Sequence, residues 1–459
     1  MSRLIHRKNI SLPSLDYLHL TKRFGIIAAS QLPLHYALAL KSWSPIQYLT
    51  RLSHEELNPY HRLFGRVITI FFSCHASMYL NFYVQKGLLL KRIRDWDVIL
   101  GVTAISTALL LNTTALAKIR DWNYRVFFYS HVILSLTLLP VLYLHVSHLR
   151  VYILETGFVY ILLIIQRNVS QSKAKATITQ LPSTNLLSIT IPLTGSLANK
   201  TYTPGQHIYL GLPSLPQKLR INPFSIANPS PAHDGKIQLV ARKLKGTTIL
   251  LADLANDSKK METTAPIPLL IEGPYGSSTH FPDRETFDRV LFVAGGVGAT
   301  FTLPLFLDLL QRIGKGERIP PIQFVWTVRR REDAQWGLQM LKEQLGDELP
   351  SEVEIYITAP RHDDNSNDEN IELQECEHLL SHPNNENVST PPSISIKHSR
   401  PNFHTLINHV FTSTASPDAS VAVLVCGPKG MGARLRREVR PWVLRRGRDV
   451  FWHGEEFGW

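Results

Sequence analysis

The sequence predicts a multi-domain protein: an α-helical transmembrane bundle, then an antiparallel β-barrel, then an α/β domain. Three observations predict this order. Residues 1–168 consist mainly of long apolar runs, as expected of membrane helices. Residues 172–284 alternate apolar and polar positions in short stretches separated by Pro and Gly, which is typical of a small barrel. Residues 288–459 follow the order strand, glycine-rich turn, apolar helix and strand, which indicates a βαβ unit.

The bulk composition narrows the class of protein. The chain has 459 residues, and its formal net charge of +12 favours contact with anionic lipid or phosphorylated ligands. Lys and Arg are scattered along the chain without a nucleic-acid-binding motif, so we expect no nucleic-acid partner. The three cysteines, Cys74, Cys376 and Cys426, are too few for a disulfide framework, which places the soluble part in a reducing compartment.

The helical part contains five segments long enough to cross a membrane, at residues 24–41, 60–83, 97–117, 124–148 and 151–167. Pro33 and Pro140 lie inside two of these segments, where neighbouring helices can satisfy the freed backbone groups. The Lys and Arg residues of the connecting loops favour neither orientation in the membrane, so the predicted topology depends on the soluble part.

Two of the apolar segments each carry a pair of histidines at the same spacing. His61 and His75 lie 14 residues apart, and so do His131 and His145. This spacing is close to four helical turns, so the members of each pair share a helix face and are separated by about 21 Å. One membrane segment separates the two helices in the chain, so they run parallel. His61 then faces His131, and His75 faces His145.

Two opposed imidazoles in an apolar bundle suit a six-coordinate haem iron, so the two pairs predict two haems, one nearer each membrane face. Imidazoles that bind a metal also avoid leaving unpaired polar groups in lipid. The alternative is a set of hydrogen-bonded histidines with no cofactor. His35, His54 and His148 lack the matched spacing, and among them only His148 is a substitute ligand.

Two stretches of the predicted barrel carry polar groups suited to a flat ring and a pyrophosphate. The strand end NPFS at 222–225 offers backbone groups and the Ser225 hydroxyl, although an ordinary barrel strand remains the alternative there. Arg242 precedes the residues 246–248 (GTT), which open a predicted helix whose N–H groups can bind a pyrophosphate.

The α/β domain carries features of a dinucleotide site. The glycines of VAGGVGAT at 293–300 lie between strand and helix, where they allow close approach of a phosphate, although a structural turn is the alternative. Arg329 follows the next strand and suits a 2′-phosphate, hence NADPH rather than NADH. Residues 426–427 end another strand beside the expected nicotinamide. Residues 361–399 are polar and Asn-rich, which predicts a disordered insertion.

Taken together, these motifs resemble the ferric reductase and NADPH oxidase family, in particular the fungal ferric-chelate reductases. The resemblance covers nearly the whole chain in order: KRFGIIAASQLPLHYALALKS, HRLFGR, YSHVILSLTLLPVLYLH, PGQHIYL, NPFSIA, IEGPYG, AGGVGAT, VCGP and EEFGW. It implies a transmembrane haem domain followed by a ferredoxin-reductase-like module, which is an FAD-binding barrel and an NADPH-binding α/β domain. Where the family has His before Pro-Phe-Ser, this chain has Asn222.

The resemblance also implies the residues that contact each cofactor. Two b-type haems are expected on His61, His75, His131 and His145. FAD is expected on Asn222, Pro223, Phe224, Ser225, Arg242, Gly246, Thr247 and Thr248. NADPH is expected on Gly295, Gly296, Gly298, Thr300, Arg329, Arg400, Cys426 and Gly427, with Gly273, Pro274, Tyr275 and Gly276 nearby. The implied catalytic set is Ser225, Cys426 and a C-terminal aromatic that shields the flavin, Phe457 or else Trp459.

The implied activity is transmembrane electron transfer from NADPH through FAD and two haems to a ferric or cupric chelate. One alternative is dioxygen as the acceptor, which would give superoxide. Another is a chain that has lost catalysis and serves as a membrane-bound partner. The expected location is the plasma membrane, with the flavin and nucleotide domains in the cytosol, and an internal membrane is the alternative.

Overall fold

The computed structural model divides the chain into two compact units, Met1–Ser170 and Gln171–Gly458. The residues that the structure describes are 14–41, 44–198, 200–213, 222–229, 235–244, 246–260, 266–276, 281, 287–311, 321–346, 352–359, 394–414, 416, 418–428 and 430–457.

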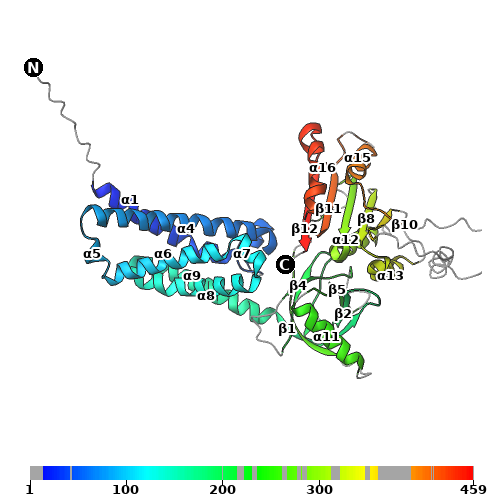
Figure 1. Ribbon diagram of the computed structural model, residues 1–459, viewed down its shortest axis with the longest axis horizontal. Coiled ribbons are helices and arrows are strands. Elements are labelled where there is room, and N and C mark those ends of the chain that lie inside the picture. Colours follow the sequence, from blue (N-terminus) through cyan, green and yellow to red (C-terminus); the bar gives the residue numbers. More distant parts are fainter. Residues whose placement is uncertain are drawn as a thin grey trace, which may run out of the picture. The chain divides into compact units, whose positions relative to one another are not determined.

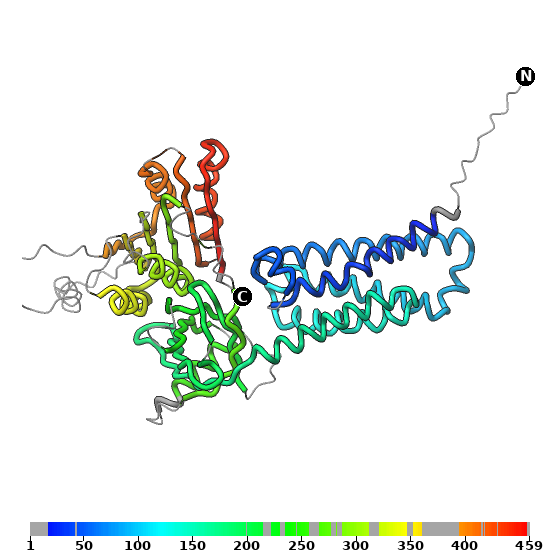
Figure 2. Tube along the Cα trace, turned by 180° about the vertical axis from the view of Figure 1, so that it is seen from behind, coloured from blue at the N-terminus to red at the C-terminus, as the bar shows by residue number. Residues whose placement is uncertain are grey.

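The first unit is a bundle of long helices joined by short ones (Figures 1 and 2). The long helices are α1 (Ser14–Ser30), α4 (His54–Gln85), α6 (Trp96–Thr114), α8 (Tyr124–His145) and α9 (Arg150–Ser170). The connecting elements are α2 (Leu32–Ala37), α3 (Pro45–Thr50), α5 (Leu89–Arg92), α7 (Ala117–Trp122) and the 3-10 turn η1 (Ser147–Leu149). The local sequence explains where two of the long helices begin. Ser53 and Glu56 form a capping box at the start of α4, and the Asn123 side chain accepts backbone N–H groups of the first turn of α8.

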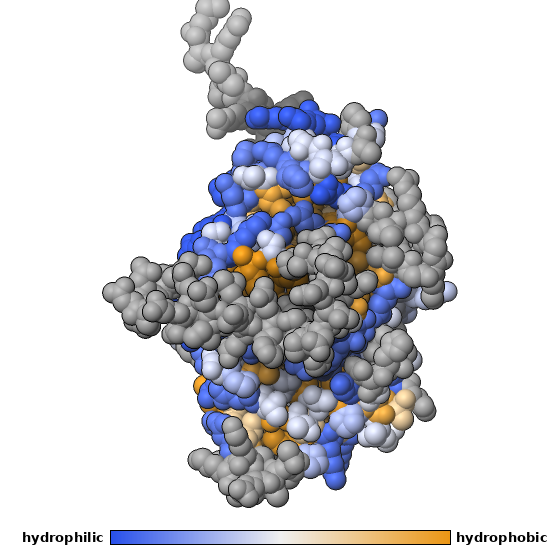
Figure 3. All heavy atoms as spheres, turned by 90° about the vertical axis from the view of Figure 1, so that its right-hand side faces the viewer, coloured by the Kyte–Doolittle hydropathy of each residue, from blue (hydrophilic) through white to orange (hydrophobic). Residues whose placement is uncertain are grey.

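Among the described residues, four helical stretches are long and apolar enough to cross a membrane: His54–Gln85, Trp96–Thr114, Tyr124–His145 and Ser147–Ser170. Many of their large apolar side chains point outward, as a lipid-facing surface requires. Ile70, Leu144 and Phe158, for example, are 60%, 61% and 63% exposed. By contrast, the coloured part of the second unit's face in Figure 3 is mainly hydrophilic, with small apolar areas.

The prediction of one membrane helix at 24–41 is wrong. The chain forms α1 up to Ser30 and restarts as α2 at Leu32, with Pro33 in the first turn of α2. Proline has no N–H to donate and its ring displaces the carbonyl four residues earlier, so a continuous helix is interrupted here. The predicted segment 124–148 is also shorter, because α8 ends at His145 and His148 lies in the exposed turn η1.

The second unit begins with a six-stranded antiparallel sheet in the order β4-β3-β6-β1-β2-β5, which curls into a nearly closed barrel. Its elements are β1 (Gln171–Gln180), β2 (Leu186–Pro192), η2 (Gly195–Leu197), β3 (His207–Gly211), β4 (Asn222–Ser225), β5 (Lys236–Arg242), α11 (Thr247–Lys260) and β6 (Ile267–Tyr275). The two edges meet just beyond β4, where the Ala227 N–H donates to the Gln238 carbonyl of β5 at 2.8 Å. The predicted barrel is therefore confirmed.

The second sheet of this unit is parallel throughout, in the order β10-β9-β8-β7-β11-β12. Its elements are β7 (Arg289–Gly295), η3 (Gly296–Gly298), α12 (Ala299–Gln311), β8 (Ile322–Val328), η5 (Arg331–Ala334), α13 (Gln335–Leu345), β9 (Val353–Ile357), β10 (Ser395–Lys397), α15 (Phe403–Thr412), β11 (Val421–Pro428), α16 (Met431–Arg446) and β12 (Val450–Phe457). Helices α12 and α13 pack on one face, and α15 and α16 on the other. Burial on both faces explains why the central strands are continuous apolar runs, and it confirms the predicted βαβ unit.

The end of the stretch expected to be disordered, 361–399, is ordered. Ser395–Lys397 forms β10 parallel to β9, and the Lys397 Nζ donates to Glu354 Oε2 at 2.8 Å. A polar, Asn-rich composition hid this short edge strand, because strand pairing depends on a partner that is distant in the sequence. Residues 361–393 lie outside the described residues.

Candidate cofactor sites

His61 of α4 and His131 of α8 face each other, with ring centroids 6.3 Å apart. A metal–nitrogen bond of about 2 Å, with the nitrogen about 1.1 Å from its ring centroid, puts two imidazoles on opposite sides of one metal about 6 Å apart. The observed spacing fits two axial ligands of one iron. The structure thus brings this predicted pair together.

Three of the four predicted ligands direct Nδ1 at a backbone carbonyl of a neighbouring helix. The contacts are His61 to His35 at 3.1 Å, His75 to Thr21 at 2.8 Å and His145 to Asp97 at 2.6 Å. An Nδ1–H that donates to a carbonyl leaves the Nε2 lone pair free, which is the usual arrangement of a metal-binding histidine. The Nδ1 of His131 is buried and has no hydrogen-bond partner among the described residues. His61, His75 and His145 therefore have the orientation of metal-binding histidines.

Two glycines make room for the rings of the second pair. A Cβ built on Gly25 of α1 would lie 2.8 Å from His75 Nδ1, and one built on Gly101 of α6 would lie 2.8 Å from His145 Cε1. Each glycine lies one helical turn after the carbonyl that its histidine contacts. Carbonyl and glycine together fix each ring against its neighbouring helix.

Strand β4 carries the predicted flavin residues Asn222–Ser225. Phe224 packs against the barrel core, so Ser225 lies on the opposite side of the strand. Ser225 pairs in register with His207 of β3, whose ring lies 5.4 Å from that of Tyr209. The Ser225 side chain is therefore on the outer side of the barrel, next to aromatic side chains, and it is 9% exposed there.

The predicted pyrophosphate site lies at the start of α11. Gly246 has φ +68°, which favours glycine, and Thr247 and Thr248 are buried. The Thr248 hydroxyl accepts the Leu244 N–H at 3.1 Å, so it stabilises the turn. The groups left for a phosphate are the helix N–H groups and the exposed Arg242 at the end of β5.

The turn at Gly273–Gly276 ends β6 and is held from the connection between β2 and β3. Gly273 and Gly276 have φ +126° and +95°. The Lys200 Nζ donates to the Gly273 carbonyl at 2.7 Å, and the Gln206 Nε2 donates to the Gly276 carbonyl at 2.9 Å. This predicted segment is therefore a fixed turn beside His207.

The glycines of the α/β domain divide into two kinds. A Cβ on Gly298 would lie 2.1 Å from the Cys426 carbonyl oxygen, and one on Gly427 would lie 3.1 Å from the Gly295 Cα. These three glycines let the ends of β7 and β11 approach closely. Gly296 differs, because it has φ +54° and a Cβ there would meet nothing within 4 Å. Its open surroundings leave space for a ligand.

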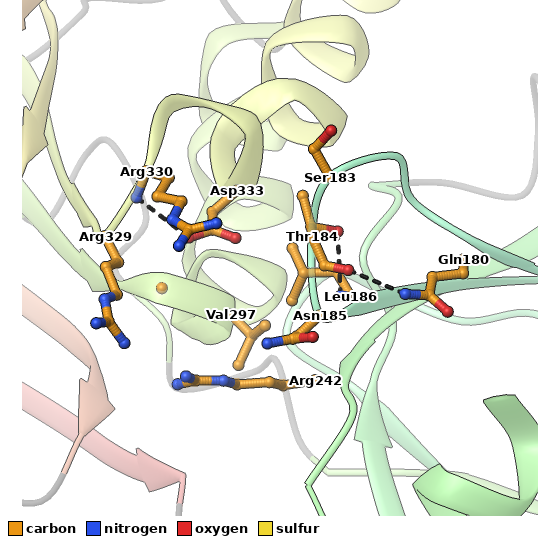
Figure 4. A pocket seen from close by; sticks show the side chains of 11 residues that line it. Gln180, Ser183, Thr184, Asn185, Leu186, Arg242, Val297, Arg329, Arg330 and Asp333 are labelled. Atoms are coloured by element: carbon orange, nitrogen blue, oxygen red, sulfur yellow. Dashed lines mark hydrogen bonds between the residues drawn. The ribbon is translucent and has the colours of Figure 1, made fainter. Parts of the chain in front are cut away.

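A pocket of about 360 Å³ opens between the barrel and the α/β domain, within the second unit (Figure 4). Its lining includes Arg242, Arg329, Arg330, Gly296 and Val297. Asp333 also borders it and accepts the Arg330 backbone N–H at 3.2 Å. Three guanidinium groups and one carboxylate make a pocket that favours phosphate. Arg242 and Arg329, predicted for the pyrophosphate and the 2′-phosphate, thus border one pocket.

Cys426 lies in β11 and is fully buried. Burial, with the negative charge of Glu455 nearby, raises the pKa of its thiol, so the thiol is protonated at neutral pH. A protonated, buried thiol is not a nucleophile. Thr300 is also buried, and its hydroxyl donates to the Val297 carbonyl at 2.8 Å, which stabilises the glycine turn.

The remaining predicted residues lie at the margins of the described chain. Arg400 is exposed just after β10. Phe457 ends β12, where its backbone pairs with Pro428, but its side chain is outside the described residues. Trp459 is also outside them.

Two residues with a clear part in these sites were missed from the sequence. The Trp326 Nε1 donates to the Gly296 carbonyl at 2.9 Å and fixes the turn that lines the pocket. The ring of His35 stacks on that of His61, with centroids 4.1 Å apart. The only sequence signal for Trp326 was its place in the strand that precedes Arg329. The spacing of His35 matches no other histidine, so the sequence gives no signal for it.

Three family models match the chain in order. "Ferric reductase like transmembrane component" matches residues 24–142, "FAD-binding domain" matches 169–279, and "Ferric reductase NAD binding domain" matches 287–440. With its four membrane-length helical stretches, the chain is an integral membrane protein. Its second unit carries an FAD-binding domain followed by a NAD-binding domain.

The chain is similar to curated proteins of fungi and plants. A probable metalloreductase of Meyerozyma guilliermondii is 24% identical, over 89% of this chain and 78% of its own length. A ferric/cupric reductase transmembrane component of Saccharomyces cerevisiae is 28% identical, over 69% and 51% respectively. A chloroplastic ferric reduction oxidase of Arabidopsis thaliana is 25% identical, over 73% and 47%. The chain thus spans about half the length of the last two.

Among solved structures, a flavohemoglobin of Malassezia yamatoensis with bound FAD and haem superimposes with a TM-score of 0.41. It is 15% identical, and the superposition covers 97% of this chain and 99% of that one. The match is too loose for a comparison of sites.

Proposed function

Because the chain belongs to the ferric reductase family, with its transmembrane, FAD-binding and NAD-binding components in order, we propose that it is an NADPH-dependent ferric or cupric chelate reductase. In this proposal electrons enter from NADPH, pass through FAD and two b-type haems, and leave on the other side of the membrane. The relatives named ferric/cupric reductase and metalloreductase support the choice of acceptor.

One observation carries the proposal: His61 and His131 face each other at the spacing of two axial ligands, in a chain that also binds a flavin and a nicotinamide nucleotide. When bound, flavin accepts two electrons from the nicotinamide and releases them singly, and haem iron carries single electrons across the bundle. The second pair, His75 and His145, has its ring orientations fixed by carbonyls, which supports a second haem.

The chain's own residues position these groups and exclude water. Ser225 directs a largely buried hydroxyl to the outer side of β4, and Cys426 supplies a small, uncharged, buried side chain at the end of β11. The Thr21 and Asp97 carbonyls hold the second pair of imidazoles in one tautomer, so each keeps Nε2 for the metal. The Asn222 side chain shares its side of β4 with Phe224, so flavin contact from β4 rests on the backbone and Ser225.

The preference for NADPH is supported by the pocket of Figure 4. Arg329 and Arg330 border it on the nucleotide side, and a 2′-phosphate would meet their guanidinium groups. The proposed location is the plasma membrane with this module in the cytosol. The free cysteines Cys74 and Cys426 are consistent with a reducing compartment.

The test uses the full chain purified in detergent. We expect a reduced-minus-oxidised spectrum of b-type haem, and NADPH-driven reduction of ferric citrate measured with a ferrous chelator. His145→Ala should lose about half of the bound haem. Well-folded protein without a haem band contradicts the proposal, and superoxide production without ferric reduction identifies dioxygen as the acceptor instead.

A second experiment tests the nucleotide. Arg329→Gln removes a charge-assisted hydrogen bond of about 1.5–3 kcal/mol, so KM for NADPH should rise roughly 10- to 100-fold while KM for NADH stays the same. Arg436→Gln, on the exposed face of α16, is the matched control and should change neither value. An equal rise for both nucleotides in Arg329→Gln contradicts a 2′-phosphate contact.

A further inference from the structure

Three imidazoles meet at the first histidine pair, where an axial pair needs two. The ring of His35 in α2 stacks on the ring of His61, with centroids 4.1 Å apart and planes 8° apart. His61 in turn faces His131 at 6.3 Å. The donor set at this end of the bundle therefore exceeds what one haem requires.

A glycine makes room for the third ring. Gly65 lies one helical turn after His61 in α4, and a Cβ built there would lie 3.1 Å from His35 Cε1 and 3.4 Å from His35 Nε2. A larger residue at this position would displace the His35 ring. The space that Gly65 leaves beside His61 thus holds an imidazole.

The His35 ring also has a nitrogen without a partner. Its Nδ1 is buried and has no hydrogen-bond partner among the residues that the structure describes. Leaving a buried polar atom unpaired costs about 1–3 kcal/mol, so an apolar bundle does not favour such a side chain unless something binds it. No described residue uses this nitrogen, so the His35 imidazole is available to a metal.

The surroundings of the second pair, His75 and His145, are different. The His75 ring contacts the ring of Tyr79, with centroids 5.0 Å apart. Among the ring contacts of the described chain, no imidazole stacks on His75 or His145. His148 is exposed in the turn η1. Among the described residues, a third imidazole therefore stacks on the first pair and on neither member of the second.

We propose that His35 is an interchangeable axial ligand at the first haem site, able to take the place of His61. The inference rests on the proposed function, because it requires haem at that site. The two rings are parallel and in contact, so rotation about the His35 side-chain torsions can carry one imidazole to the place of the other. His131, which faces His61, is the ligand on the opposite side.

The test measures bound haem and its spectrum in the full chain, without reference to activity. His61→Ala should keep both haems and a low-spin, bis-histidine spectrum, because His35 replaces the lost ligand. The double variant His35→Ala/His61→Ala should lose about half of the haem. His35→Ala alone should keep both haems, and His75→Ala, the matched control in the second pair, should lose about half.

Two further measurements keep the outcome decisive. FAD content and elution as a single species verify folding, and His61→Gln provides a second substitution that keeps a polar side chain. If His61→Ala and His61→Gln lose as much haem as the double variant, the proposal for His35 is overturned while the proposed function stands. If the folded wild type binds no haem, both are overturned.

Discussion

Glycine serves opposite purposes in the two units of this protein. In the helical unit, a Cβ at Gly25 or Gly101 would meet an imidazole ring at 2.8 Å. In the α/β domain, a Cβ at Gly298 would meet the backbone of Cys426 at 2.1 Å. A ring can turn away from a methyl group, whereas a strand in the middle of a sheet cannot. The same change to alanine therefore tests ligand geometry in the first unit and folding in the second.

The largest effect is expected for Gly298→Ala. The carbonyl that it would strike belongs to Cys426, which pairs in register with Ala294 across β7 and β11, so relief requires the two strands to part. We expect a loss of stability of about 3 kcal/mol or more, at the upper end for overpacked sites. Thermal unfolding, monitored through the release of FAD, measures this loss of stability.

A matched control for Gly298→Ala lies on the neighbouring helix. Gly432→Ala places its Cβ 3.7 Å from Val425 Cγ1, which is an ordinary contact. It should leave the unfolding temperature at or slightly above that of the wild type, since alanine favours a helix. Equal destabilisation by both changes would contradict the argument from backbone contact.

A smaller and more local effect is expected for Gly101→Ala. The new methyl group forces the His145 ring to tilt away from the Asp97 carbonyl, at a cost of about 1–2 kcal/mol, while the helices stay assembled. The spectrum of one haem should change or its content fall, with the melting temperature nearly constant. Gly157→Ala in α9, where a Cβ meets nothing within 4 Å, should leave the spectrum unchanged.

Trp326→Phe tests the glycine turn of the α/β domain in another way, because it removes a hydrogen bond to the turn and leaves the glycines themselves unchanged. The change removes the Nε1–H donor to the Gly296 carbonyl, and a buried hydrogen bond contributes about 1 kcal/mol. We expect roughly fivefold weaker NADPH binding, measured by fluorescence titration. Trp336→Phe is the matched control, because its buried Nε1 has no hydrogen-bond partner among the described residues. If both variants bind NADPH equally, the Gly296 turn does not depend on that bond.

The sequence predicted those parts of the sites that follow from spacing along one element. The 14-residue spacing placed His61 opposite His131, because both lie on regular helices. The order of strand, glycine turn and helix likewise predicted where Gly296 lies. The barrel and the parallel sheet were predictable for the same reason, since their apolar patterns repeat with the strand period.

What the sequence left out depends on contacts between distant elements. His35 stacks on His61 from α2, the short helix that begins after the interruption at Gln31. The apolar composition of this stretch does not reveal that interruption. The role of Trp326 depends on a hydrogen bond across 30 residues of sequence. Strand β10 depends on pairing with β9 across the Asn-rich stretch. Such contacts are set by tertiary packing and leave no local pattern.

The smallest effect is expected at Gly296, the glycine that meets neither ring nor strand. Within the described chain, its φ of +54° is the structural reason for glycine, and asparagine tolerates that conformation better than alanine does. Gly296→Ala should cost about 1 kcal/mol of stability and Gly296→Asn less. If the open space beside Gly296 holds part of the nucleotide, Gly296→Asn should fold like the wild type and yet bind NADPH several-fold more weakly. Wild-type binding by a folded Gly296→Asn would show that the space lies outside the nucleotide's reach, and the conformation alone would then explain this glycine.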